Sequence, residues 1–310
     1  MRLDIAAFTD IGRRKIKNED AFGVCREDDP ELRLFKEGAL LCVADGLGGH
    51  TGGEIASKLA VSIITDIVKH PPIVPSTDNG EVDERDEGPL PVLRQAIQRA
   101  NDSIFLTNRD QDLVRTKRPM GTTVLTAIIE PKKVYVGNVG DSRCYHFRDG
   151  DIIAHTEDHS WVDEQVRMGL MSKAEAETDH RRNIVTRCVG THDEVSVDTY
   201  RWFVAPGDML LLCTDGLVNM VPDKDIKAVF RAGGTSGEVA QRLIQLANEN
   251  GGKDNITVVV ATISPNPIRH VMLRTRAFVR RHHVSPAKIA ATLIYGLVAF
   301  GLGYAVHAYL

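Results

Sequence analysis

Short apolar runs that end at glycine, aspartate or proline recur through the first 263 residues of the chain. They are rich in Val, Ile, Leu and Thr, a composition that predicts strands. The candidate strands are ALLCVA, TTVLTAII, KVYVGNVG, SRCYHFR, MLLLCT and NITVVVATI. Several are apolar almost throughout, which is typical of strands covered on both faces. The pattern therefore predicts sheets whose two faces are covered by a second sheet or by helices.

Apolar residues at three- and four-residue intervals predict helices among these strands. The candidate helices are GEIASKLAVSIITDIVKH, LPVLRQAIQRANDSIFLTNR, SWVDEQVRMG, SKAEAET and TSGEVAQRLIQLANENG. Ser236 resembles an N-cap for the last of them. The first two are separated by a loop over residues 70–91 that is rich in Pro, Asp and Glu, which we interpret as an exposed insertion.

The last 22 residues, 289–310, read IAATLIYGLVAFGLGYAVHAYL and are apolar on every helical face. A helix of this length spans about 33 Å, enough to cross the hydrocarbon core of a bilayer. The preceding stretch, 266–288, carries arginine and lysine but no acidic residue. This asymmetry predicts a transmembrane helix with the large N-terminal domain on the cytoplasmic side. The alternative is a terminal helix that is buried or binds a partner.

Composition and charge mainly exclude certain classes of function. The formal net charge of −4 argues against nucleic-acid binding driven by phosphate neutralisation. The five cysteines are widely spaced and include no CxxC pair, so we interpret them as reduced thiols of a cytosolic core.

Acidic residues gather where the predicted strands end or begin. Asp45, Asp141 and Asp215 each follow a strand, Asp254 precedes one, and KNEDA supplies Glu19 and Asp20. A single aspartate at such a place is usually turn chemistry. Several of them brought together would repel one another strongly unless cations neutralised their charge.

Ligands that are all oxygen atoms suit Mg²⁺ or Mn²⁺ better than zinc. Two such ions about 3.5–4 Å apart would share a carboxylate, activate a bridging water and stabilise an in-line displacement at phosphorus. The basic run Arg13, Arg14, Lys15 and Lys17 lies just before Glu19 and would offer a cation to a phosphate group. The alternative for this run is a solvated loop.

The chain resembles the bacterial-type metal-dependent protein serine/threonine phosphatases of the protein phosphatase 2C (PPM) family. The motifs match in the same order over residues 4 to about 263. The matching motifs are TDIGRRKIKNEDA, VADGLGGHTGGEIAS, MGTTV, VGNVGDSR, DHS, RRNIVTRCVG, LLLCTDGL and KDNITVVV. The resemblance implies an α+β fold, a four-layer αββα sandwich of two antiparallel sheets flanked by helices. The apolar C-terminal segment adds the single C-terminal transmembrane helix predicted above.

The resemblance and the apolar C-terminal segment together divide the chain. Residues 1–265 would form the catalytic domain, with a flap at about 158–189 beside the active site. Residues 266–288 would be a basic juxtamembrane linker, and residues 289–310 the transmembrane helix.

By the same resemblance, Asp45 is the carboxylate that bridges two metal ions, and Gly46 ligates one of them through its carbonyl. Asp215 and Asp254 hold the other ion directly. The pair Glu19–Asp20 engages the second ion directly or through waters.

Three further positions follow or depart from the family pattern. Asp141 resembles the residue that binds a third ion, although Asn219 stands where some members have an acidic residue for it. Lys15 stands where the family usually has an arginine that grips the substrate phosphate, and Arg13 and Arg14 flank it. Lysine binds phosphate as a point charge and lacks the bidentate fork of arginine.

The function implied is Mn²⁺- or Mg²⁺-dependent hydrolysis of phosphoserine and phosphothreonine in substrates of Ser/Thr kinases, with two ions and a third at Asp141. The implied partners are phosphorylated proteins and, through the C-terminal helix, membrane lipid, with no nucleic acid. The implied location is the bacterial plasma (inner) membrane, single-pass, with a cytoplasmic catalytic domain. Two alternatives are a pseudophosphatase that only binds phosphoproteins and a phosphatase of small phosphorylated metabolites. Pseudophosphatases typically lose metal carboxylates, and all the expected ones are present here.

Overall fold

The computed structural model describes residues 2–26, 38–48, 52–71, 88–111 and 119–264. They belong to one compact unit, which ends at Ser264. The predicted linker 266–288, the predicted transmembrane helix 289–310 and residues 72–87 of the predicted loop lie outside the described residues.

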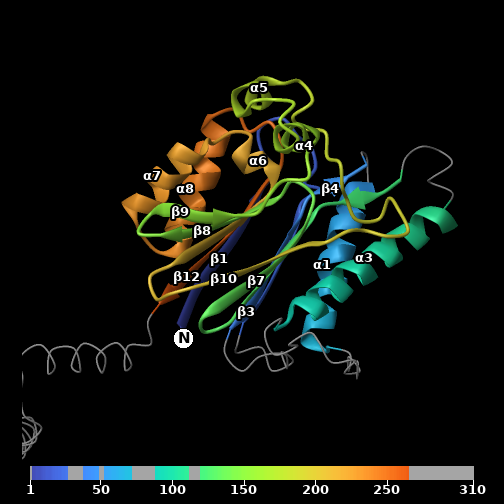
Figure 1. The fold of residues 1–310 in the computed structure, drawn as a ribbon, viewed down its shortest axis with the longest axis horizontal. Coiled ribbons are helices and arrows are strands. Elements are labelled where there is room, and N and C mark those ends of the chain that lie inside the picture. The colour runs from blue at the N-terminus through green and yellow to red at the C-terminus, as the bar shows by residue number, and fades with distance from the viewer. Residues whose placement is uncertain (1, 27–37, 49–51, 72–87, 112–118, 265–310) are drawn as a thin grey trace, which may run out of the picture. The chain divides into compact units, whose positions relative to one another are not determined.

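Two five-stranded antiparallel sheets form the centre of this unit (Figure 1). The first has the order β1 (Arg2–Asp10), β12 (Ile256–Ser264), β11 (Met209–Cys213), β8 (Arg143–Arg148) and β9 (Asp151–His155). The second has the order β10 (Asp198–Phe203), β7 (Lys133–Val139), β6 (Val124–Ile129), β3 (Ala39–Ala44) and β2 (Ala21–Arg26). A short pair, β4 (Gly46–Leu47) with β5 (Gly121–Thr122), continues from β3. Every predicted strand is present.

The helices cover the outer faces of the two sheets (Figure 1). The second sheet is covered by α1 (Gly52–Lys69) and α3 (Leu90–Asp110), and the first by α6 (Asp215–Val218), α7 (Asp223–Ala232) and α8 (Ser236–Glu249). The helices α4 (Trp161–Arg167) and α5 (Lys173–Thr178) lie in the predicted flap. All five predicted helices are present, whereas α6 and α7 were not predicted.

Strand β3 shows how one apolar run serves two cores. Successive side chains of a strand point to opposite faces. Leu40, Cys42 and Ala44 therefore pack toward α1 and α3, while Leu41 and Val43 pack between the two sheets. A third core lies between the first sheet and α6, α7 and α8. The predicted α+β sandwich of two antiparallel sheets with flanking helices is confirmed.

The N-cap predicted for the last helix is wrong by one residue. Thr235 is the N-cap, and it forms a capping box with Glu238. Ser236 already belongs to the first turn of α8, and its hydroxyl donates to the carbonyl of Asp4 in β1 at 2.7 Å. Its side chain therefore anchors the helix to the sheet and does not cap it.

None of the described helices combines the length and the apolar character that crossing a membrane requires. The candidate span at 289–310 is not among them.

A candidate metal centre at one end of the sandwich

The predicted site residues come together at one end of the two sheets. Antiparallel pairing brings the start of one strand beside the end of its neighbour, as Ala21 beside Ala44 shows. The acidic positions follow β3, β7 and β11 and precede β2 and β12: they are Asp45, Asp141, Asp215, the Glu19–Asp20 pair and Asp254. In Figure 1 this is the upper end, where β4, α6 and the flap helices α4 and α5 are labelled.

Asp45 is held by its backbone, which leaves its carboxylate free for the site. Its N–H donates to Thr123 Oγ1 at 2.9 Å, and its carbonyl accepts from Thr122 Oγ1 at 2.8 Å. The next residue, Gly46, has no room for a side chain, because a Cβ there would lie 2.2 Å from the carbonyl oxygen of Gly53 and 2.6 Å from that of Glu19. Glycine thus lets the start of α1 approach the acidic cluster.

Asp20 is the more buried residue of the Glu19–Asp20 pair, with 6% of its surface exposed. Its Oδ2 accepts hydrogen bonds from the hydroxyls of Thr214 at 2.9 Å and Thr257 at 2.7 Å. Burial raises the pKa of Asp20 to about 7, against the lowering effect of these two hydroxyls and with a further rise from the nearby Asp215. Asp20 therefore takes up protons readily when no cation is near.

The pKa values of Asp215 and Asp45 are raised in the same way. Burial raises the pKa of Asp215 to about 6, and Asp254 adds to the rise, while a side-chain hydrogen bond with Asp45 opposes it. The pKa of Asp45 lies well above its usual range because of burial and then the charges of Asp20 and Asp215. Carboxylates that raise one another's pKa values in this way repel when they are charged, and a cation among them would relieve that repulsion.

Asp141 lies within reach of this cluster. Burial and then the charge of Asp215 raise its pKa well above the usual range, and Asp158 adds to the rise. Asn219, at the end of α6, donates from Nδ2 to Asp215 Oδ2 at 2.9 Å. The amide side chain thus supports Asp215 and brings no additional charge to the cluster.

Three carboxylate oxygens of the site are buried and have no hydrogen-bond partner among the described residues. They are Glu19 Oε1, Asp20 Oδ1 and Asp215 Oδ1. Buried acceptors without a donor are costly, so each suggests a missing cation or water. No group of three His, Cys, Asp or Glu side chains in the described part has the geometry of a ready metal site. The unpartnered oxygens are still compatible with a metal site, because Mg²⁺ keeps several water ligands and needs few protein atoms. The donor set therefore fits hard divalent cations.

Lys15 is the basic residue that reaches the cluster. Its Nζ lies 2.6 Å from Asp254 Oδ1. Burial by itself would lower the pKa of Lys15, but the hydrogen bond with Asp254 and the charges of Asp45 and Glu19 raise it. Arg13 and Arg14 are exposed in the same turn, and neither forms an ion pair with an acidic residue of this cluster.

Sequence reasoning missed Asn255, which organises the loop that carries Lys15. Its Oδ1 accepts the N–H of Glu19 at 2.8 Å, and its Nδ2 donates to the carbonyls of Ile11 and Lys17 at 3.0 and 2.9 Å. Thr123, which binds the backbone of Asp45, was also missed. Both lie within matching motifs, Asn255 in KDNITVVV and Thr123 in MGTTV. Their place in these motifs, beside the predicted site, was the available signal.

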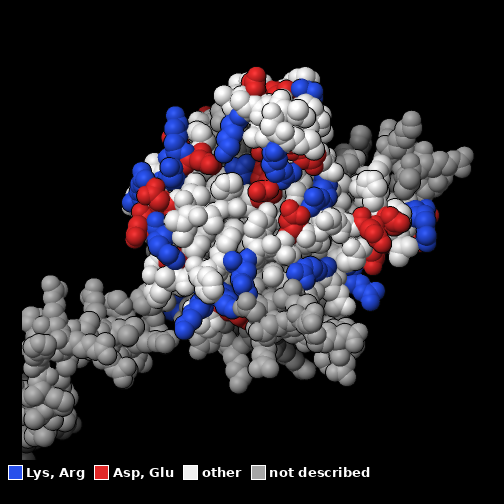
Figure 2. Space-filling view, in the orientation of Figure 1, with Lys and Arg blue, Asp and Glu red and all other residues white. Residues whose placement is uncertain are grey.

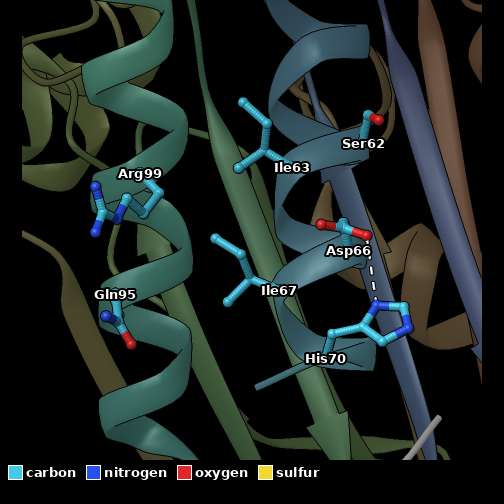
Figure 3. A pocket seen from close by; sticks show the side chains of 7 residues that line it. All are labelled: Ser62, Ile63, Asp66, Ile67, His70, Gln95 and Arg99. Carbon is cyan, nitrogen blue, oxygen red and sulfur yellow. Dashed lines mark ion pairs between the residues drawn. The ribbon is translucent and has the colours of Figure 1, made fainter. Parts of the chain in front are cut away.

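A groove elsewhere on the surface is separate from this centre. It lies between α1 and α3, with Ile63 and Ile67 on the α1 side and Arg99 on α3 (Figure 3). The Nδ1 atom of His70 lies 3.4 Å from Asp66 Oδ1 at one end of the groove. None of the predicted site residues lines it.

Charged side chains of both signs alternate over the described part of the face drawn in Figure 2. Lys and Arg do not gather there into a continuous stripe of the kind that tracks a phosphate backbone.

Two antiparallel sheets between helix layers, with an acidic cluster at one end, define the class of metal-dependent phosphatases with the PPM fold. The chain belongs to the protein phosphatase 2C family, whose model matches residues 12–256. The family predicted from the motifs is thereby confirmed.

Named relatives agree with this assignment. The serine/threonine phosphatase stp of Listeria monocytogenes is 37% identical over 253 residues, which cover 81% of this chain and 92% of that protein. The structure of the serine/threonine phosphatase Stp1 from Staphylococcus aureus is 33% identical, with a TM-score of 0.72, and the match covers 86% of this chain and 96% of that one. The catalytic domain of the serine/threonine protein phosphatase PstP, in complex with two manganese ions, is 30% identical, with a TM-score of 0.66, over 85% of this chain and 99% of that one.

Proposed function

We propose that this chain is a protein phosphatase that hydrolyses phosphoserine and phosphothreonine in proteins and depends on Mn²⁺ or Mg²⁺. The family and its named serine/threonine phosphatases support this activity. The structural observation that carries the proposal is the cluster of buried carboxylates with raised pKa values and unpartnered oxygens.

The proposed ligand set follows from where these oxygens lie. The charges of Asp20 and Asp215 both act on the Asp45 carboxylate. By resemblance to the family, Asp45 would be the carboxylate that two ions share, and the carbonyl of Gly46 would add one more oxygen. Asp141 would hold a third ion. When bound, such ions activate a water molecule and neutralise charge on the phosphoryl group. Asp20 and Asp215, whose pKa values are raised, would have to be deprotonated to hold the ions, because metal ligands must be deprotonated.

Lys15 is the proposed phosphate-binding residue. Its ammonium group forms an ion pair with Asp254. With a cation held at Asp254, the ammonium group would be available to phosphate oxygens, which lysine binds as a point charge. Its loop is held to β12 by Asn255, so the ammonium stays close to the carboxylates.

A phosphorylated metabolite is the alternative substrate, and a direct comparison tests it. We expect the full chain with Mn²⁺ to hydrolyse a phosphothreonine peptide with a kcat/KM at least ~100-fold above that for a sugar phosphate. The peptide and sugar-phosphate assays share one enzyme preparation and one phosphate-release readout. A preference for the sugar phosphate would contradict the protein substrate, and binding of the peptide without turnover would support a pseudophosphatase.

We also propose that the chain is anchored in a bacterial plasma membrane by residues 289–310, with the catalytic domain in the cytoplasm. The support is in the sequence alone: an apolar stretch long enough to span the bilayer follows a basic segment without acidic residues. Substrates at or near the membrane surface would then be favoured by proximity.

Membrane fractionation tests the anchor. We expect the full chain to stay in the membrane fraction through washes with high salt and then with alkali, because a spanning helix is held by hydrophobic burial and not by charge. A variant that ends at Ser264 is the control and should be found in the supernatant. Release of the full chain by either wash would mean adhesion to the surface.

A further inference from the structure

A basic loop lies beside the acidic cluster, and most of its cations have no acidic partner. Residues 13–17 read RRKIK, and all five side chains are exposed. Lys15 pairs with Asp254. Among the described residues, four other exposed cations at this rim form no ion pair: Arg13, Arg14, Lys17 and, next to Asp254, Lys253. The rim of the centre therefore presents positive charge to whatever approaches it.

The backbone of this loop is fixed although its side chains are exposed. The N–H of Arg13 donates to the carbonyl of Gly252 at 2.7 Å, and Asn255 binds the carbonyls at both ends of the loop. Gly12 has a φ of +80°, and a Cβ on it would lie 2.2 Å from the carbonyl oxygen of Asp254, so only glycine allows this close approach. The cations are therefore anchored at the rim, which lowers the entropy lost when they bind a partner.

The loop crosses the rim from the turn after α8 to the start of α1. Arg13 lies at that turn, through its backbone hydrogen bond. Lys17 lies toward Glu54 in the first turn of α1: the pKa of Glu54 is lowered first by Lys58 and then by the charge of Lys17. Lys15 lies between these two sides, at the acidic cluster. The proposed phosphate-binding residue therefore has a cation on each side of it.

The loop is also far from the point where the chain leaves the catalytic unit. Asp10, which precedes the loop, pairs with Ile256, whereas Arg2 pairs with Ser264 at the lower end in Figure 1. β12 has nine residues, so its two ends are about 27 Å apart. A polypeptide that occupies the metal centre is therefore the anion that these cations are placed to meet, in preference to lipid at the opposite end.

We propose that the loop of residues 11–17, together with Lys253, is a subsite for acidic side chains that flank the phosphorylated residue of a protein substrate. The inference rests on the proposed function, because the phosphorylated residue must occupy the metal centre. Successive residues of an extended peptide lie about 3.3–3.6 Å apart, so carboxylates within two or three positions of the phosphate would reach cations on both sides of Lys15. Arginine binds a carboxylate through two parallel hydrogen bonds, and lysine binds it as a point charge. The subsite would thus select among phosphoproteins by the sequence around the phosphate.

Three phosphothreonine peptides of equal length measure this selection. They carry Glu, Gln or Lys at the two residues on each side of the phosphothreonine and are otherwise identical. One exposed charge pair changes affinity by about 1.5–5-fold. Because several pairs act together, we expect the full chain in detergent with Mn²⁺ to show a kcat/KM about 10-fold higher for the Glu peptide than for the Gln peptide, and lowest for the Lys peptide. The difference should lie in KM, since these cations do not touch the reacting atoms. It should largely disappear in about 1 M salt, where the Debye length is about 3 Å.

Arg13→Gln and Lys17→Gln test the two sides of the loop. Both side chains are exposed, so neither substitution removes a buried contact. We expect each to lower the ratio of kcat/KM between the Glu and Gln peptides by about 2–5-fold, and the double variant to bring the two peptides within about 2-fold of each other. Lys224→Gln is the control, because Lys224 is an exposed lysine of α7, and it should keep the wild-type ratio. The unphosphorylated Glu peptide should also inhibit turnover of the Gln phosphopeptide more strongly than the unphosphorylated Gln peptide does, a readout of binding alone.

The outcomes separate this inference from the proposed function. Equal kcat/KM for the Glu and Gln peptides, or a ratio that the double variant leaves unchanged, would overturn the subsite while the phosphatase activity stands. Equal values together with inhibition by micelles that contain phosphatidylglycerol, lost in the double variant, would assign the loop to lipid headgroups instead. If none of the three phosphopeptides is hydrolysed, the proposed function itself fails.

Discussion

We expect the replacement of Asp45 with asparagine to abolish phosphatase activity, with a loss of at least about 10³-fold in kcat. The substitution keeps the shape of the side chain and removes the charge that the two proposed ions share. It also leaves the backbone contacts with Thr122 and Thr123 in place. Initial rates on a phosphothreonine peptide at saturating Mn²⁺ measure the effect.

The fold of this variant should persist, and its response to metal should disappear. In the metal-free chain the pKa of Asp45 is raised by burial and by Asp20, so the side chain already tends to be neutral, as asparagine is. We expect a midpoint temperature at or above that of the metal-free wild type and little further rise with Mn²⁺. Asp151→Asn is the control, because Asp151 is exposed and pairs with Arg231 away from the cluster. Near-normal turnover in Asp45→Asn would refute the proposed ligand set.

Chelation of divalent cations removes all turnover and makes the stability of the chain fall as pH rises. Burial raises the pKa of Asp20 to about 7 and that of Asp215 to about 6. The native carboxyl groups hold protons that unfolded ones, with pKa values near 3.9, have lost. Their contribution to stability is therefore complete below about pH 4 and is lost as pH rises through about 6 to 7.

Buried histidines act in the opposite direction, since burial lowers the pKa values of His146 and His159. The measurement is therefore a difference: the free energy of unfolding of the metal-free wild type minus that of Asp20→Asn, which retains both histidines. We expect this difference to become more negative between about pH 5 and pH 7.5. Stabilisation by Mn²⁺ should grow over the same range, because the ion binds deprotonated carboxylates. Parallel pH profiles for the two proteins, or turnover that survived chelation, would contradict the prediction.

The strands with one continuous apolar run could be predicted from the sequence, and others could not. β3 is buried along its whole length and stands out as ALLCVA. β10, with the sequence DTYRWF, lies at the edge of its sheet and is only partly buried, so its sequence carries polar residues and no clear alternation. β1 is defined by its pairing with β12, from Arg2 beside Ser264 to Asp10 beside Ile256. A local pattern does not reveal a partner so far away in the chain.

Helix α7 was missed for a related reason. Only Ile226 and Phe230 of its ten residues are buried, one turn apart. Val229 is partly buried as well, so three apolar positions have helical spacing, but a run this short does not establish a helical period. Their packing against the core between the first sheet and α8 is what stabilises this short helix.

The sequence by itself determined which residues are candidates for the chemistry, because the acidic residues stand at strand ends and their side chains can only be oxygen ligands. The tertiary structure decided how they act. It brought Lys15 to Asp254, left oxygens of Glu19, Asp20 and Asp215 without donors, and fixed Arg13 against Gly252. Residue type and strand boundaries are local properties of the chain. Burial, hydrogen-bond partners and the pKa shifts that follow from them depend on segments far apart in sequence, and these meet only when the two sheets pack together.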